Sequence, residues 1–166
     1  MDFLNSKDFY YKTAIVTIIV IFSELVLGSY VKSIGAGLSC PDWPLCYGEV
    51  IPINHFNRYV WSEYLHRVTA SVVSILIVVL AYLTFIHRNE MTNQGFQIGQ
   101  RRLKLMVLIL CLLAIQVILG GLTVIYQVNP DIVTSHLAVG TLIFGSTIFL
   151  FTKIDPQVGK NSLESL

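Results

Sequence analysis

Long apolar runs separated by short polar segments make up most of this chain. Each apolar run is close to the length of about 20 residues that a helix needs to cross a bilayer. The apolar runs cover residues 14–31, 60–86, 105–125 and 132–151. They predict an all-α integral membrane protein, a four-transmembrane-helix bundle. We expect one membrane domain over residues 1–153, with an outer loop at 32–59, and a polar cytoplasmic tail at 154–166.

The composition agrees with this class, since 54% of the residues are hydrophobic and 13% are charged. Soluble domains have fewer apolar and more charged residues. The first apolar run follows a short polar start, as a secretory signal does. It is longer than the roughly 7–15 apolar residues of a signal core, so we interpret it as a helix that is retained.

The basic residues predict the orientation in a plasma membrane, because lysine and arginine collect on the cytoplasmic side. One side carries Lys7, Lys12, Arg88, Arg101, Arg102, Lys104, Lys153 and Lys160, and the other carries Lys32, Arg58 and Arg67. Both termini are therefore expected in the cytoplasm. The basic segment 88–104 is short and tied to two helix ends, so we expect no nucleic-acid partner.

An internal repeat relates the first two helices to the last two. A polar residue, three aliphatic residues and a glycine occur at 24–28 and again at 116–120. The second and fourth helices each carry a histidine near the outer end, His66 and His136. We interpret the bundle as two repeated helix pairs, a common construction in membrane proteins.

The two histidines are predicted at similar depth, because each lies a few residues into its helix and the rise is about 1.5 Å per residue. Such a pair suits haem iron bound from opposite faces. Ala70 and Gly140, one turn further in, would leave room for a flat macrocycle. The alternative for each histidine is an interfacial anchor or a bond to a backbone carbonyl.

Glu63 lies three residues before His66 and four before Arg67, so the three share a helix face. One interpretation is a structural ion pair with Arg67. The other is a carboxylate beside a macrocycle, where it moves protons or stabilises positive charge. Glu24 and Gln116, inside apolar helices, are expected to hydrogen-bond across helices, with a proton path as the alternative.

Of the three cysteines, Cys40 and Cys46 lie in the outer loop, where the compartment is oxidising and they can pair. A disulfide that closes so short a loop stabilises the folded protein by about 2 kcal/mol. Pro41 and Pro44 already stiffen it, so both a structural and a redox role stay open. Cys111 is expected to be a small buried apolar residue.

Three motifs together closely resemble the haem A synthase family over most of the chain. They are Cys-Pro-Asp-Trp-Pro-Leu-Cys at 40–46, Ile-Pro at 51–52 and Glu-x-x-His-Arg at 63–67. The resemblance implies a membrane enzyme that oxidises a ring methyl group of haem O to a formyl group. Two successive hydroxylations would give haem A for a terminal oxidase.

The resemblance also implies roles for individual residues. His66 and His136 match the axial ligands of haem iron, Glu63 matches the functional carboxylate, and Arg67 is predicted to bind the haem. Haem O is then the substrate and haem A the product, with a second haem, haem b, left open. The implied partners are haem O, a haem O synthase, a terminal oxidase and the lipid bilayer.

Cys40 and Cys46 match the paired outer cysteines of that family, with electron transfer or loop stability as their role. Typical members have eight helices in two halves, and these four carry the features of the catalytic half, as in half-size members found among archaea. A homo-oligomer would restore eight helices, which we take as a hypothesis.

Two other functions fit parts of this pattern. A bis-histidine cytochrome b, an electron carrier, needs His66 and His136 but neither Glu63 nor the cysteine loop. A quinone-linked thiol–disulfide oxidoreductase has four helices and outer cysteines. However, such enzymes use Cys-x-x-Cys and a second outer pair, and residues 126–131 contain no cysteine.

Overall fold

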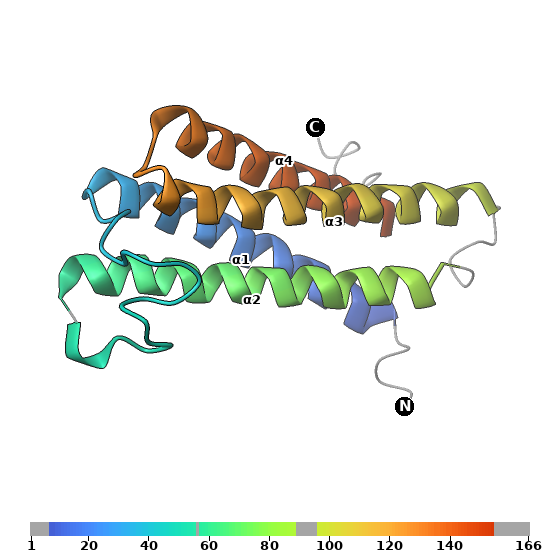
Figure 1. The fold of residues 1–166 in the computed structure, drawn as a ribbon. Helices are drawn as coiled ribbons and strands as arrows, with labels where there is room; N and C mark the ends of the chain where they lie inside the picture. Colours follow the sequence, from blue (N-terminus) through green and yellow to red (C-terminus); the bar gives the residue numbers. More distant parts are fainter. Residues whose placement is uncertain (1–6, 56, 89–95, 155–166) are drawn as a thin grey trace, which may run out of the picture.

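A computed structural model describes residues 7–55, 57–88 and 96–154 of the chain (Figure 1). Its long helices are α1 (Lys7–Ser33), α2 (Arg58–Ile86), α3 (Phe96–Ile125) and α4 (Pro130–Ile154), with a short 3₁₀ helix, η1 (Ile53–His55), before α2. All four long helices are long and apolar enough to cross a membrane. The predicted all-α membrane bundle is therefore confirmed. The predicted tail lies outside the described residues, except for Ile154, which ends α4.

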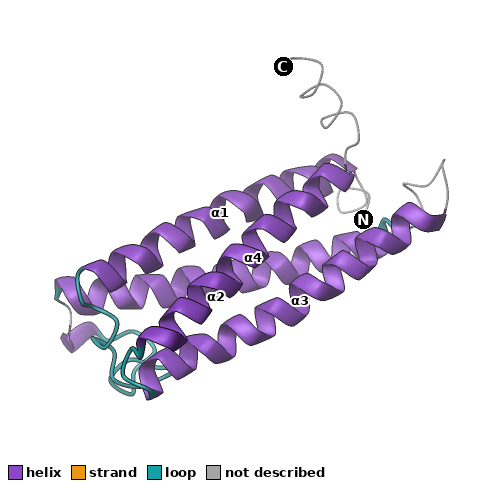
Figure 2. Cartoon of the chain, turned by 90° about the horizontal axis from the view of Figure 1, so that it is seen from above, coloured by secondary structure: helices purple, strands orange, loops and turns teal. Residues whose placement is uncertain are grey.

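The four helices lie side by side along one direction, and the two views show the loops at their ends (Figures 1 and 2). α1 packs chiefly on α2, and α3 on α4, with contacts between α1 and α4 and between α2 and α3 completing the bundle. This pairing agrees with a repeated helix pair, whose common origin stays a prediction.

The centre of the bundle is filled by aliphatic side chains from several helices, among them Ile77 and Leu80 of α2, Ile109 of α3 and Leu150 of α4. Many apolar side chains also face outward, as expected for helices that contact lipid. Cys111 is one of the exposed residues, so the expectation that it is buried is wrong. A thiol is weakly polar and is compatible with a lipid-facing surface.

Local signals set where α2 and α4 begin. Asn57 caps α2, since its Oδ1 accepts hydrogen bonds from the backbone N–H groups of Tyr59 and Val60. The α3–α4 turn is short, and Asn129 Oδ1 accepts from the N–H of Asp131 in the first turn of α4. Pro130 is the first residue of α4, a position that needs no N–H donor. The tight turn returns α4 directly alongside α3.

A polar end cluster joins the helices at the end opposite the α1–α2 connection. It consists of the buried side chains of Tyr10, Thr84, His87 and Arg102. The hydroxyl groups of Tyr10 and Thr84 are 2.8 Å apart, and the Tyr10 ring stacks on His87 with centroids 5.4 Å apart. At the same end Tyr11 of α1 packs on Phe151 of α4, with ring centroids 4.9 Å apart. This end of the bundle is closed by contacts between all four helices.

Candidate functional site

His66 of α2 faces a carboxylate on α1. Its Nδ1 lies 2.8 Å from Glu24 Oε1, and the two side chains are 21% and 13% exposed. The other oxygen of Glu24 accepts a hydrogen bond from the Thr69 hydroxyl, one turn along α2. The prediction that Glu24 bonds across helices is confirmed. The carboxylate that contacts His66 is thus Glu24, while Glu63 is directed elsewhere.

His136 of α4 occupies the matching place beside α3. Its Nε2 lies 3.4 Å from the amide nitrogen of Gln116, which confirms the expected contact across helices. α1 connects the two histidine regions: Glu24 contacts His66, and a Cβ atom at Gly140, one turn from His136, would lie 3.1 Å from Leu25, the residue after Glu24. The room expected beside Gly140 is taken, since a Cβ there would lie 3.0 Å from Gln116 Nε2.

A glycine lies against each imidazole. A Cβ atom at Gly28 would lie 2.9 Å from Cε1 of His66, and one at Gly120 would lie 3.4 Å from Cε1 of His136. In both helix pairs the contacting polar residue precedes the glycine by four positions and so lies on the same face of the helix. The repeat in the sequence therefore marks the helix face that meets each histidine, a signal that sequence reasoning did not use to place Glu24.

The two glycines offer a matched pair of substitutions. Gly28→Ala is expected to lower the free energy of unfolding by about 1–3 kcal/mol, because the new methyl group overlaps the His66 ring. Gly120→Ala is expected to lower the free energy of unfolding by less, because its methyl group would make a nearly ordinary van der Waals contact with His136. Thermal unfolding in detergent checks both. Equal stability of the two variants would contradict the close contact at Gly28.

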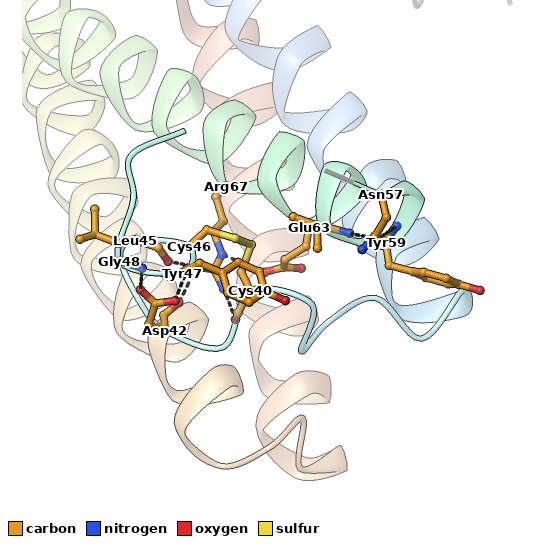
Figure 3. Close-up of a disulfide and its surroundings, with 11 residues drawn as sticks. Cys40, Asp42, Leu45, Cys46, Tyr47, Gly48, Asn57, Tyr59, Glu63 and Arg67 are labelled. Atoms are coloured by element: carbon orange, nitrogen blue, oxygen red, sulfur yellow. Dashed lines mark hydrogen bonds and ion pairs between the residues drawn. A yellow bond between two sulfur atoms is a disulfide. The ribbon is translucent and has the colours of Figure 1, made fainter. Parts of the chain in front are cut away.

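Arg67 connects α2 to the cysteine loop (Figure 3). Its Nε donates to Glu63 Oε1 at 2.9 Å, and its Nη1 and Nη2 donate to the backbone carbonyls of Asp42, Leu45 and Cys40. Four of the five N–H groups that a guanidinium carries are thereby used. The ion pair with Glu63 is therefore present, and the role of Glu63 beside a macrocycle stays a prediction.

The cysteine loop is held by a disulfide between Cys40 and Cys46, as the sequence allowed. Both cysteines are buried and pack with Val60 and Tyr64 of α2. Between them Trp43 extends to α3, where a Cβ atom on Gly121 would lie 3.3 Å from the indole ring. The loop thus contacts both helix pairs. A redox role for the cysteines stays a prediction.

Asp42 organises the turn that follows the loop. Its two carboxylate oxygens accept hydrogen bonds from the backbone N–H groups of Tyr47, at 2.6 Å, and Gly48, at 2.8 Å. Both residues have positive φ, 57° and 72°, which is why a glycine suits the second position. These bonds, above all that from Gly48, lower the pKa of the Asp42 carboxyl group.

The lowered pKa of Asp42 predicts a pH-dependent loop. The folded-state pKa of Asp42 is below its unfolded value near 3.8. The Asp42 carboxylate therefore stabilises the loop fully at pH values above the unfolded pKa. This stabilisation is lost as the pH falls through the folded-state pKa. Limited proteolysis of the loop between pH 6 and pH 2 measures this, with an acid-stable protease. The loop of the Asp42→Asn variant should be cleaved faster than that of the wild type at pH 6, and its cleavage rate should depend less on pH. A pH profile of cleavage that matches the wild type would contradict the prediction.

The histidine pair fits haem better than a directly bound metal ion. The described residues contain no group of three or more His, Cys, Asp or Glu side chains that could hold a metal ion. A haem iron takes only two ligands from the protein, and the imidazoles of His66 on α2 and His136 on α4, one from each helix pair, would provide them. Nδ1 of His136 and Oε1 of Gln116 are also buried without a hydrogen-bond partner. Such groups are unusual and indicate a site that receives a further polar group.

Comparison with known proteins agrees with this arrangement. The family model described as cytochrome oxidase assembly protein, COX15-CtaA, matches residues 11–164. A heme A synthase of an Exiguobacterium species is 32% identical over 130 residues, which is 76% of this chain and 39% of the relative. A heme A synthase of Lysinibacillus sphaericus is 29% identical over 134 residues, 80% of this chain and 41% of the relative.

The chain spans about two fifths of the length of these relatives. No solved structure matches it. The family match covers nearly the whole bundle, including His66, His136 and the cysteine loop. This multi-pass membrane protein therefore belongs to the COX15-CtaA family of cytochrome oxidase assembly proteins, the family of the haem A synthases.

Proposed function

We propose that the protein makes haem A by oxidising a ring methyl group of haem O to a formyl group. Each of two successive hydroxylations removes two electrons, which the haem iron would pass to an external electron acceptor, with water as the source of oxygen, and the resulting hydrated aldehyde loses water. The observation that carries the proposal is the pair His66 and His136. They come from separate helix pairs, and each imidazole faces a polar side chain of the helix it packs on, Glu24 for His66 and Gln116 for His136.

In this proposal His66 and His136 would hold the iron of haem O. Glu63 is the functional carboxylate, oriented by its ion pair with Arg67. Arg67 binds the haem through the one N–H group that its contacts to Glu63 and the loop leave over, which suits a propionate of the substrate. Cys40 and Cys46 brace the loop above the site or carry electrons to it.

The bias of lysine and arginine supports an orientation in the plasma membrane with both termini in the cytoplasm and the cysteine loop outside. The chemistry requires a haem O synthase to supply the substrate and a terminal oxidase to receive the product. We propose that the bundle works as a homo-oligomer, and that residues 1–153 form the membrane domain.

The test is co-expression with a haem O synthase, followed by extraction and chromatography of the haems bound to the purified protein. Haem A is the expected product. Bound haem B or haem O that is never converted, with an electron acceptor present, would favour the cytochrome b interpretation. Protein that binds no haem would favour the thiol–disulfide oxidoreductase.

A further inference from the structure

Glu24 has no part in the proposed chemistry, yet it contacts one of the two histidines. Its side chain is 13% exposed, within an apolar helix, and its Oε1 lies 2.8 Å from Nδ1 of His66. Thr69 donates to its other oxygen from α2. Burying a carboxylate in a membrane helix is costly, so such residues are retained for a function.

The short distance defines where the imidazole carries its proton. The ring N–H is not well aligned with the oxygen, since Nδ1 of His66 meets no strict hydrogen-bond geometry. At 2.8 Å a proton must lie between this nitrogen and the carboxylate oxygen, because two lone pairs would repel each other at that distance. With an ionised Glu24 and a neutral imidazole, that proton belongs to Nδ1, and Nε2 keeps a lone pair for a metal.

The other helix pair is built differently at the same place. Gln116 corresponds to Glu24 in the repeat, but its amide is neutral and lies 3.4 Å from Nε2 of His136. That nitrogen is the one left for a metal when Nδ1 is protonated. Glu24 thus contacts Nδ1 of His66, whereas Gln116 lies beside Nε2 of His136.

We propose that Glu24 is a positioning residue that presents Nε2 of His66 as the stronger of the two iron ligands. His136 binds iron only after Gln116 has moved away from its Nε2. The inference rests on the proposed function in so far as haem is the ligand. A carboxylate hydrogen-bonded to a ligating histidine increases the basicity of that ligand, and its loss typically costs about 10–100-fold in metal affinity.

The first test needs no haem. The chain has four histidines, so ¹⁵N-histidine NMR of the full-length protein in detergent can assign each ring, with His66→Gln identifying the signal of His66. We expect a proton on Nδ1 of His66. In Glu24→Leu, which removes the acceptor, that preference is expected to disappear, while Gln116→Leu leaves the His66 signal unchanged. Wild-type His66 protonated on Nε2 alone would overturn the inference.

The second test uses the haem-loaded protein and spectroelectrochemical titration. A basic, anionic ligand environment favours ferric iron, so Glu24→Gln is expected to raise the reduction potential. A tenfold loss of preference for ferric haem corresponds to about 59 mV. Gln116→Glu, the matched change in the other pair, is expected to lower the potential. An unchanged potential in both variants would also overturn the inference.

The two arms separate this inference from the proposed function. If the wild type binds no haem, or binds it without making haem A, the proposed function fails. The position of the proton on His66 still decides the role of Glu24. If haem A forms normally while Nδ1 of His66 carries no proton, the proposed function stands and the inference fails.

Discussion

Arg67→Ala is expected to destabilise the protein by about 3–5 kcal/mol, the usual cost of leaving one partner of a buried ion pair without the other. The Glu63 side chain is 8% exposed and that of Arg67 is 14% exposed, so water screens the pair only weakly. The variant also removes the donor to three carbonyl groups of the cysteine loop. Denaturant unfolding in detergent measures the loss, and faster proteolysis within the loop reports its release from α2.

A double variant, Glu63→Leu with Arg67→Met, is the control. It removes both charges, so no buried carboxylate is left unpaired, and it is expected to be more stable than Arg67→Ala. The single variant Glu63→Gln, which keeps Arg67, separates the two interpretations of Glu63. A folded Glu63→Gln variant that binds haem O but makes no haem A assigns the carboxylate to the chemistry. An Arg67→Ala variant as stable as the wild type would contradict the contacts described here.

His66→Ala and His136→Ala are each expected to reduce haem retention by more than roughly 100-fold. An axial ligand contributes more than an outer partner, whose loss alone costs about 10–100-fold. The measurement is the haem content of the purified protein, from its Soret absorbance. The matched control is His55→Ala, which removes an exposed histidine that stacks on Tyr47 with ring centroids 4.0 Å apart. His55→Ala is expected to retain haem.

A wild-type haem content in His66→Ala would remove that residue from the site. Loss of haem from His55→Ala to the same degree would show that the loop, and not the histidine pair, holds the ligand. The two histidine variants also need a folding control. Their helix content by circular dichroism is expected to match that of the wild type, because neither residue terminates a helix.

The four helices were predictable because the thickness of a bilayer sets the length of an apolar run. The helices α1 and α3 begin several residues before their predicted ranges, since hydropathy marks the apolar part of a helix and not its polar ends. Hydropathy also could not show whether Cys111 is buried in the bundle or exposed on its surface. In a membrane, both the lipid-facing surface and the interior are apolar, so the two environments leave the same pattern.

The site was partly predictable for similar reasons. The spacing on one helix offered an ion pair of Glu63 with Arg67 as one of two interpretations, because residues four apart on a helix are neighbours, and that ion pair is present. The contact of Glu24 with His66 depends on how α1 is rotated against α2, which is a matter of packing between helices. The hydrogen bonds from Arg67 to the loop reach backbone carbonyls, which every residue possesses and which no side-chain pattern can therefore mark.

The polar end cluster determines where this bundle can open. Contacts among Tyr10, Thr84 and His87 join α1 to α2, and the contact of Tyr11 with Phe151 joins α1 to α4. All of these contacts lie at the end of the bundle opposite His66 and His136. Local stability in a protein follows the density of such buried contacts. We therefore expect motions that separate α2 from α4 to pivot about this cluster. The end that carries His66 and His136 is then expected to move most, and a broad, flat molecule is expected to enter there while the cluster stays intact.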